Sequence, residues 1–391
     1  MALLEHISAV RGKYKEANKF LSKTIDRLSE KPSAGGATGI SGEVISMMQK
    51  MQPKNLLRPL KINFKGEGAQ DEGGCKNEMF SQFFDAVFSP KSLYFERQQG
   101  NAEAKGSGAG AGGMDCYLPK VDANLDALRS IGKLMMKSLL EDDICLPHCL
   151  PPSFFDFLTD PTCSVPSDTH QALNALSYFD EQKAKGLTNL LLKEQYVGMA
   201  VGDMFDTDAD CEDGESEDAP LTAGNIGGCI RRYVGHVLVR SRRVQLDALR
   251  DGFLTAVPGL AKHLELFHGI ELMQILCGVA HIDAEAVLGS ISFDGVGGVS
   301  SVVGGYLQRF VREANNDTGT LKKIISFATG ISVIPNQGLR MKIRVKRGSA
   351  SLWVSHTCFY ELELPECSSY EEFAQKATCS LENGAVGFGQ K

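Results

Sequence analysis

The sequence predicts an α+β protein in which helices outnumber strands. Apolar residues recur at helical spacing in several stretches, most clearly in 125–139 and 228–253. Two shorter stretches, 60–64 and 339–346, alternate apolar and polar residues as half-buried strands do. A chain of 391 residues is long enough for two or three domains, so we expect more than one hydrophobic core.

The composition is that of an ordinary soluble globular protein, with 43% hydrophobic and 23% charged residues. A net charge of −7 argues against a protein built to bind nucleic acid. No apolar run approaches the roughly 18 residues that cross a membrane, and Glu5 and His6 interrupt any signal-peptide core. The cysteines follow no regular frame, so we expect reduced thiols in the cytoplasm or nucleus.

The chain begins with a predicted helix over residues 3–28, because apolar residues recur at alternating spacings of four and three, broken only at Thr24. We expect this apolar seam to pack on the domain that follows; the alternative is a helix that binds a partner or a second copy. The Gly/Ser/Ala-rich residues 33–42 predict a flexible linker. A short helix is expected over 45–60.

The predicted strand 60–64 leads into a stretch rich in glycine and acidic residues, 64–74, and then into a helix with an apolar face. That face comprises Met79, Phe80, Phe83, Phe84, Val87 and Phe88. The glycines do not form a phosphate-binding loop, because the G-x-x-x-x-G-K-[ST] pattern is absent and the carboxylates would repel a phosphate. We therefore interpret 64–74 as a tight turn before the helix.

Two stretches contain the residue types of metal sites, and we expect no metal or cofactor at either. Cys145, His148 and Cys149 lie close together, but zinc takes four ligands and no second cluster follows nearby, so we expect an apolar loop. Residues 203–218 place carboxylates at calcium-loop positions, but Cys211 replaces the turn glycine, so we expect a solvated insertion. The Gly/Ala/Ser-rich residues 99–113 predict a disordered loop.

Basic residues gather on the predicted helix 228–253 and on one face of the predicted strand 339–346. In both places we expect a solvated face rather than a binding surface. A last helix is expected over 370–381.

The segment from Ser355 to Pro365 is the strongest candidate for chemistry. An extended run would place His356 and Cys358 on the same face, where an imidazole favours the reactive thiolate. Pro365 cannot donate a ladder hydrogen bond, so the strand should end there. A buried structural cysteine beside a chance histidine is the alternative interpretation.

This segment, L-x-x-S-H-T-C-F-x-x-L-x-L-P, resembles the active-site segment of HECT-type ubiquitin ligases, in which the cysteine of H-T-C-F accepts ubiquitin as a thioester. Other elements resemble the family in the same order along the chain, over about residues 41–391. They are the glycine-rich stretch 64–74, Ile131-Gly132-Lys133-Leu134, Arg250-Asp251-Gly252-Phe253, residues 271–278, Phe327-Ala328-Thr329-Gly330 and the tail Gly387-Phe388-Gly389, which matches the natural C-terminus of the family.

The resemblance implies a bilobal architecture with a flexible hinge. The implied parts are an N-terminal amphipathic helix (1–32), a linker (33–42), a mostly helical N-terminal lobe (43–277) with a small docking subdomain at about 165–225, a hinge (278–280) and an α/β C-terminal lobe (281–391). Glycine at the hinge tolerates the backbone rotation that a swivel needs.

The resemblance also implies roles for individual residues. Cys358 would carry the thioester, with His356 and Thr357 orienting the thiol and the oxyanion. Phe388 would anchor the tail. The hinge would be formed by Gly278, Val279 and Ala280, and the docking groove for the conjugating enzyme by Leu187, Leu191, Phe205 and Tyr233.

The expected function is that of a HECT-type ubiquitin-protein ligase. Its partners would be a ubiquitin-conjugating enzyme, ubiquitin and a protein substrate with an acceptor lysine, without nucleic acid or membrane. Two alternatives remain open. One is a cysteine hydrolase that uses Cys358 and His356, although such enzymes typically place the histidine far away in sequence. The other is a catalytically impaired module that binds ubiquitin or the conjugating enzyme.

Overall fold

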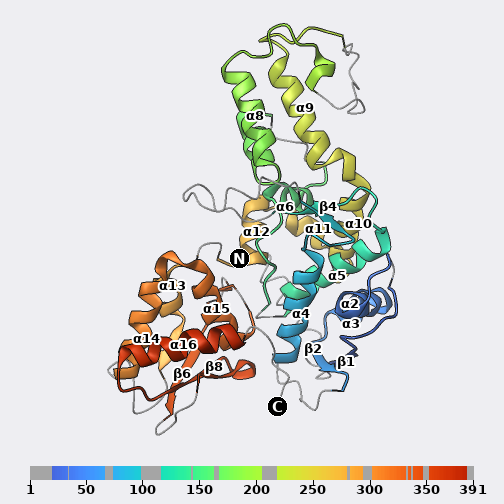
Figure 1. Ribbon diagram of the computed structural model, residues 1–391. Helices are drawn as coiled ribbons and strands as arrows, with labels where there is room; N and C mark the ends of the chain where they lie inside the picture. The colour runs from blue at the N-terminus through green and yellow to red at the C-terminus, as the bar shows by residue number, and fades with distance from the viewer. Residues whose placement is uncertain are drawn as a thin grey trace.

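Helices and short strands form a mixed α+β fold, as the sequence predicts (Figure 1). Three hydrophobic clusters organise it, which we name the main, the small and the C-terminal cluster. For residues 204, 358 and 383 the structure describes only the backbone. The computed structural model describes residues 20–33, 35–66, 74–97, 116–141, 144–162, 167–204, 218–279, 282–293, 302–331, 333–335, 338–346 and 352–384.

The main cluster is built around the crossing of α5 (Leu125–Leu140) and α10 (Arg243–Leu254), where two glycines let the helix backbones approach closely. A Cβ at Gly132 would lie 2.0 Å from a carbonyl oxygen of α10, and one at Gly252 would lie 2.0 Å from a carbonyl oxygen of α5. The other elements are α2 (Gly39–Lys50), α3 (Pro53–Leu56), α4 (Gly74–Val87), α6 (Pro152–Thr159), α11 (Leu260–Leu264), α12 (Gly269–Cys277) and the paired strands β3 (Phe95–Glu96) and β4 (Leu118–Pro119).

The predicted strand 60–64 and the two helices after it are confirmed. β2 (Leu60–Phe64) is followed by α4, which buries Met79, Phe80, Phe83, Phe84 and Val87, whereas Phe88 lies just past its end. The apolar face expected for α5 is buried as well, apart from its half-buried ends at Leu125 and Leu139. These elements combine a clear periodicity with aromatic or aliphatic bulk, so burial follows from the sequence pattern alone.

The helix predicted over residues 3–28 is wrong for Leu21–Ile25, which form strand β1 in parallel pairing with β2. Residues 3–19 lie outside the described part of the chain. Exposure alternates along β1 and Ile25 is buried. The apolar residues that suggested a helix therefore fit a strand that pairs with β2. The Gly/Ser/Ala-rich linker is also shorter than predicted, because α2 begins at Gly39 and the Ser33 N–H bonds to the Ala37 carbonyl at 2.8 Å.

The small cluster is a separate helical unit that extends away from the main cluster (Figure 1). Asp168 and Asp180 cap two of its helices, because their carboxylates accept hydrogen bonds from the backbone N–H groups of Gln171 and Lys183. Its elements are α7 (Thr169–Ser177), α8 (Glu181–Leu192), η2 (Val201–Met204) and α9 (Ile226–Leu238).

The single helix predicted over 228–253 is wrong, because α9 and α10 belong to different clusters and η3 (Arg240–Arg242) separates them. Arg242 is buried there and donates hydrogen bonds from Nη1 to the Glu96 carboxylate at 3.1 Å and the Pro119 carbonyl at 3.0 Å. Arg250 also donates to a backbone carbonyl, that of Leu158, at 3.1 Å. The expectation of a purely solvated basic face is therefore wrong for these two arginines.

The C-terminal cluster packs helices against a four-stranded sheet of order β5-β6-β8-β7. On β6, Met341 and Ile343 are buried while Arg344 and Lys346 face outward, as the alternation predicts. The strands are β5 (Ile291–Phe293), β6 (Met341–Lys346), β7 (Val354–His356) and β8 (Glu361–Pro365). The helical elements are α13 (Ala284–Gly289), α14 (Val302–Glu313), η4 (Ala314–Asn316), α15 (Thr318–Thr329), η5 (Thr357–Phe359) and α16 (Tyr370–Gly384).

Within the described part of the chain, no helix has both the length and the hydropathy to cross a bilayer. The predicted disordered loop 99–113 lies outside the described residues, as does most of the acidic stretch 203–218.

We expect Gly132→Ala to destabilise the protein by about 2–3 kcal/mol, because the added methyl group meets backbone rather than a movable side chain. Urea unfolding measures this change. Gly186→Ala in α8 is the matched control: it is exposed with open space around it, so the better helix propensity of alanine should stabilise by up to about 1 kcal/mol. Equal effects of the two substitutions would contradict the close crossing of α5 and α10.

Candidate active site

Cys358 lies in a turn, so the predicted continuous strand from Ser355 to Pro365 is wrong. β7 and β8 pair antiparallel, with His356 opposite Glu361, and η5 carries the backbone of Cys358 between them. The chain reverses at Tyr360, whose φ of +52° lies in the left-handed region that large side chains rarely adopt. Alternation along one strand therefore does not describe how positions 356 and 358 relate. β8 does end at Pro365, as predicted.

The residues next to Cys358 leave the turn open to solvent on one side. Phe359 is 60% exposed and His356 is exposed as well, whereas Thr357 is half-buried. We name residues 356–360 the catalytic turn, after the role that the sequence resemblance implies for Cys358.

A charged face lies beside the catalytic turn, on β6 and β8. The Glu361 Oε1 atom lies 2.8 Å from Arg344 Nη1. The Glu363 carboxylate lies 3.6 Å from Lys346 Nζ and 3.7 Å from His356 Nε2. The carboxylates and the imidazole lie within 4.8 Å of one another, a spacing that a metal ion could bridge. Because each carboxylate already faces a cation of β6, we interpret this face as an ion-pair network.

The catalytic turn also touches the main cluster, through Asn77 of α4. The Asn77 Nδ2 atom donates toward the Tyr360 hydroxyl at 3.5 Å and toward the Thr329 carbonyl at 3.3 Å. Gly330 follows with a φ of +77°, and a Cβ there would lie 3.5 Å from the Asn77 Cβ and 4.0 Å from the Thr357 Cβ. These residues are far apart in sequence, so no sequence pattern could have joined them.

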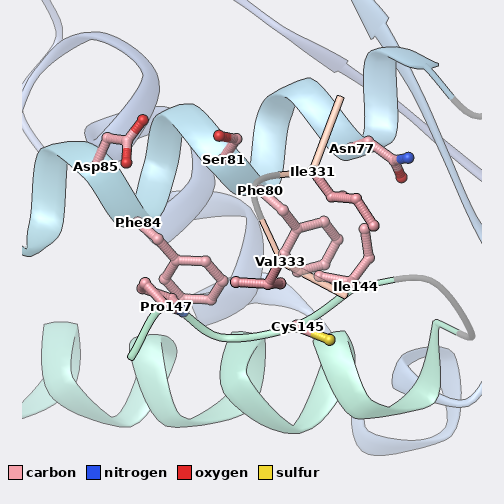
Figure 2. Close-up of a pocket in the computed structure, with 10 residues that line it drawn as sticks. All are labelled: Asn77, Phe80, Ser81, Phe84, Asp85, Ile144, Cys145, Pro147, Ile331 and Val333. Atoms are coloured by element: carbon pink, nitrogen blue, oxygen red, sulfur yellow. The ribbon is translucent and has the colours of Figure 1, made fainter. Parts of the chain in front are cut away.

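A narrow pocket continues this contact between the clusters (Figure 2). We name the contact the α4 seam. Its cavity of about 40 Å³ is lined by α4, by the loop before α6 and by the residues after α15. The lining side chains include Phe80, Phe84, Ile144, Pro147, Ile331 and Val333, and they approach one another from these separate segments in Figure 2.

Gly278 lies where the chain leaves α12 for the C-terminal cluster. Its φ of +71° and ψ of −154° suit glycine, and a Cβ would lie 2.5 Å from the Ile334 carbonyl oxygen. The Val279 N–H donates to that same carbonyl at 2.9 Å. Ala280, the third predicted hinge residue, lies outside the described residues.

The predicted docking residues are only partly on the surface. Leu187 is buried in the small cluster, so its side chain packs rather than protrudes. Leu191 and Tyr233 are half-buried, and Lys183 Nζ lies 5.1 Å above the Tyr233 ring. Phe205 and the tail residue Phe388 lie outside the described residues.

Among the described residues of the small cluster's helical unit, the most exposed large apolar side chains are ones that the sequence interpretation did not select. Leu192, at the end of α8, is 67% exposed, and Val197, in the turn after it, is 73% exposed. Their exposure follows from α8 ending at Leu192, a boundary that no capping signal in the sequence marks.

The Cys145–Cys149 stretch forms a loop against α12, as predicted. Burial raises the pKa of the Cys149 thiol and of the Cys277 thiol next to it, so both stay protonated at neutral pH. Burial is also the main cause that lowers the pKa of His148, with nearby Lys322 contributing.

We expect Gly278→Ala to destabilise the protein by about 2 kcal/mol or more, because a side chain is strained at this φ and meets the Ile334 carbonyl. Urea unfolding monitored by the single tryptophan, Trp353, reports on the C-terminal cluster directly. Gly289→Ala is the control, since this exposed glycine of α13 has ordinary φ and open space. An unchanged free energy of unfolding for Gly278→Ala would contradict this prediction and would mean that the backbone at this position can relax.

Comparisons with known proteins identify the family to which the chain belongs. The family model described as HECT-domain (ubiquitin-transferase) matches residues 75–391, which include the catalytic turn. The NEDD4-like E3 ubiquitin-protein ligase and bifunctional serine/threonine-protein kinase of Dictyostelium discoideum is 28% identical over 257 residues, 64% of this chain and 12% of that protein. The E3 ubiquitin-protein ligase RSP5 of Saccharomyces cerevisiae is 23% identical over 366 residues, 88% of this chain and 42% of that protein.

The E3 ubiquitin-protein ligase ptr1 of Schizosaccharomyces pombe is 31% identical over 182 residues, 44% of this chain and 6% of that protein. The chain thus spans less than half the length of each of these three relatives. The family model, in contrast, covers most of the chain, including all of its C-terminal cluster. The chain belongs to the HECT-domain (ubiquitin-transferase) family.

Proposed function

We propose that this chain is a HECT-type ubiquitin-protein ligase that carries ubiquitin as a thioester on Cys358. The observation that carries the proposal is the family match, which spans the turn holding Cys358. Exposed His356 and Phe359 on either side of that cysteine support it, because the thiol has to meet large protein partners.

The proposed reaction consists of two acyl transfers. The Cys358 thiolate attacks the carbonyl carbon of the thioester that joins ubiquitin to its conjugating enzyme, and the thiolate of that enzyme leaves. Because sulfur replaces sulfur, this exchange needs chiefly positioning. A neutral substrate lysine amine then attacks the new thioester, the Cys358 thiolate leaves, and the amine loses a proton to form the amide bond.

The neighbours of Cys358 would serve these steps. An imidazole near a thiol favours the thiolate, which is the role we propose for His356. The Thr357 hydroxyl would contribute to the site of the tetrahedral oxyanion. The amine must lose its proton, and a free lysine has a pKa of roughly 10.4, so a base or an acidic neighbour, whose carboxylate can accept the proton, would help. Phe388 would anchor the tail during the second transfer, as the family resemblance implies.

We further propose a bilobal domain arrangement with a swivel at Gly278, Val279 and Ala280. Separate main and C-terminal hydrophobic clusters on either side of these residues support this proposal. The N-terminal lobe would run from 43 to 277, with the docking subdomain at about 165–225, and the C-terminal lobe from 281 to 391. The swivel is needed because one sulfur atom must face a carrier and then a substrate.

The conjugating enzyme would dock on the small cluster. Leu187 is buried, so we assign it to packing, and we give the contact surface to Leu192 and Val197 together with the half-buried Leu191 and Tyr233. Exposed leucine and valine side chains on a small helical unit are what a partner surface requires. The compartment, cytoplasm or nucleus, is part of the same proposal, and the described cysteines are present as thiols.

The chain should form an adduct with ubiquitin when mixed with activating enzyme, a conjugating enzyme, ATP and ubiquitin, and thiol reductant should remove it. Cys358→Ala should abolish the adduct, and Cys358→Ser should replace it with an oxygen ester that resists reductant, because serine forms an ester. Non-reducing and reducing gels separate these products. Cys379→Ala, at another thiol of the C-terminal part, is the control and should behave as wild type.

An adduct that persists in Cys358→Ala would exclude Cys358 as the acceptor. If the adduct were discharged at the same rate with and without added amine, the cysteine hydrolase would be favoured instead, because its acceptor is water.

Leu192→Asp and Val197→Asp should each slow adduct formation by about tenfold or more, since a charge in an apolar contact is costly to bury. The rate of adduct formation at limiting conjugating enzyme measures the effect. Leu266→Asp is the control, because this leucine is equally exposed but lies outside the small cluster. Equal slowing by all three substitutions would place the docking surface elsewhere.

A further inference from the structure

The catalytic turn has a side-chain neighbour on the main cluster that the two transfers described above do not use. Asn77 is 3% exposed, and its amide nitrogen points at both the Tyr360 hydroxyl and the Thr329 carbonyl. Tyr360 is the residue at which the chain turns after Cys358, and its left-handed φ of +52° is strained for a tyrosine. A conformation of this kind persists only where surrounding contacts hold it.

Contacts on both sides hold the turn at Tyr360. The Lys342 N–H donates to the Tyr360 carbonyl at 2.7 Å, which ties the backbone of the turn to β6. The hydroxyl at the other end of the same residue faces Asn77 of α4. Tyr360 thus links the sheet of the C-terminal cluster to a helix of the main cluster.

The residues that follow α15 lie between the C-terminal cluster and the main cluster, next to Asn77 and Tyr360. Gly330 lies between Asn77 and Thr357, and a Cβ built there would be in ordinary van der Waals contact with both. The next residues, Ile331 and Val333, enter the α4 seam beside Phe80 and Phe84 (Figure 2). The same segment ends at Ile334, which receives the Val279 N–H.

This contact is specific but weakly held. Both hydrogen bonds of Asn77 are longer than the usual 2.7–3.2 Å range, and its Oδ1 atom is buried without a hydrogen-bond partner. A buried oxygen without a partner disfavours the docked state relative to one in which water reaches the amide. The cavity of about 40 Å³ in the seam also leaves the apolar packing incomplete. An interface of this kind can dock and release.

We propose that Asn77 is a positioning residue that holds the catalytic turn, through the Tyr360 hydroxyl, in the orientation used for transfer to the amine. This inference rests on the proposed ligase function. In Figure 1, α8 and α9 extend from the opposite end of the main cluster to β8, so the catalytic turn docked at α4 lies away from the proposed docking surface of the conjugating enzyme. The docked arrangement therefore suits the second transfer rather than the first.

The test separates the two transfers. The full chain is loaded with ubiquitin, the supply of new thioester is stopped by removing ATP and the activating enzyme, and discharge to free lysine is followed over time. Asn77→Ala and Tyr360→Phe should each slow discharge by about 3–10-fold, the range expected for one hydrogen bond, with loading rates within about twofold of wild type. The double variant should be no slower than Asn77→Ala alone, because both changes remove one interaction.

Two controls accompany these single and double variants. Ser81→Ala, one helical turn further along α4 and in the same seam, should leave both rates unchanged. Thermal unfolding of each variant identifies one that fails to fold, and Tyr360→Phe, which removes a single oxygen atom, keeps the inference testable if Asn77→Ala does not fold.

Unchanged discharge in Asn77→Ala or Tyr360→Phe, additive effects in the double variant, or equal slowing of loading and discharge would overturn the positioning role. Those outcomes leave the ligase function intact, because the adduct on Cys358 would still form. A wild-type chain that forms no adduct would instead overturn the proposed function itself.

Discussion

The backbone at Gly278 is the constraint on which the rest of the arrangement depends. Its φ of +71° and ψ of −154° end α12 and turn the chain toward the C-terminal cluster, and the Ile334 carbonyl occupies the space where a side chain would lie. The Val279 N–H donates a hydrogen bond to the same carbonyl. The segment after α15 is therefore held against the main cluster directly after the end of α12. The position of the α4 seam, and with it the neighbourhood of the catalytic turn, follows from this crossing.

The catalytic turn has a backbone that is held by several contacts and an outer side that is exposed to solvent. Its interior is fixed, because β7 and β8 pair across it, Tyr360 is held in a left-handed conformation, and the Glu361 and Glu363 carboxylates face cations of β6. Its outer side is open, with Phe359 exposed. A turn held in this way would present the proposed nucleophile, Cys358, to different partners with the same local geometry, which suits the two proposed acyl transfers.

The sequence patterns succeeded where periodicity and burial agree. The helices α4 and α5 and the strands β2 and β6 carry regular apolar faces that are buried, and they form as predicted, although β6 begins at Met341 rather than at Leu339. The patterns failed where a partner distant in sequence decides. Leu21–Ile25 form a strand because they pair with β2. The predicted helix 228–253 is interrupted at η3, where buried Arg242 donates hydrogen bonds to Glu96 and Pro119 from another part of the chain. Boundaries set by such contacts leave no trace in local sequence.

The sequence by itself determined the family resemblance, the candidate nucleophile Cys358 and the end of the following strand at Pro365, because these depend on residue identity at fixed spacing. Only the tertiary structure decided that this segment folds back as a turn rather than running straight, that Asn77 lies against Tyr360, and that His356 faces Glu363. The reason is physical: each of these features depends on contacts between segments that only folding brings together, and neither composition nor periodicity records which segments those are.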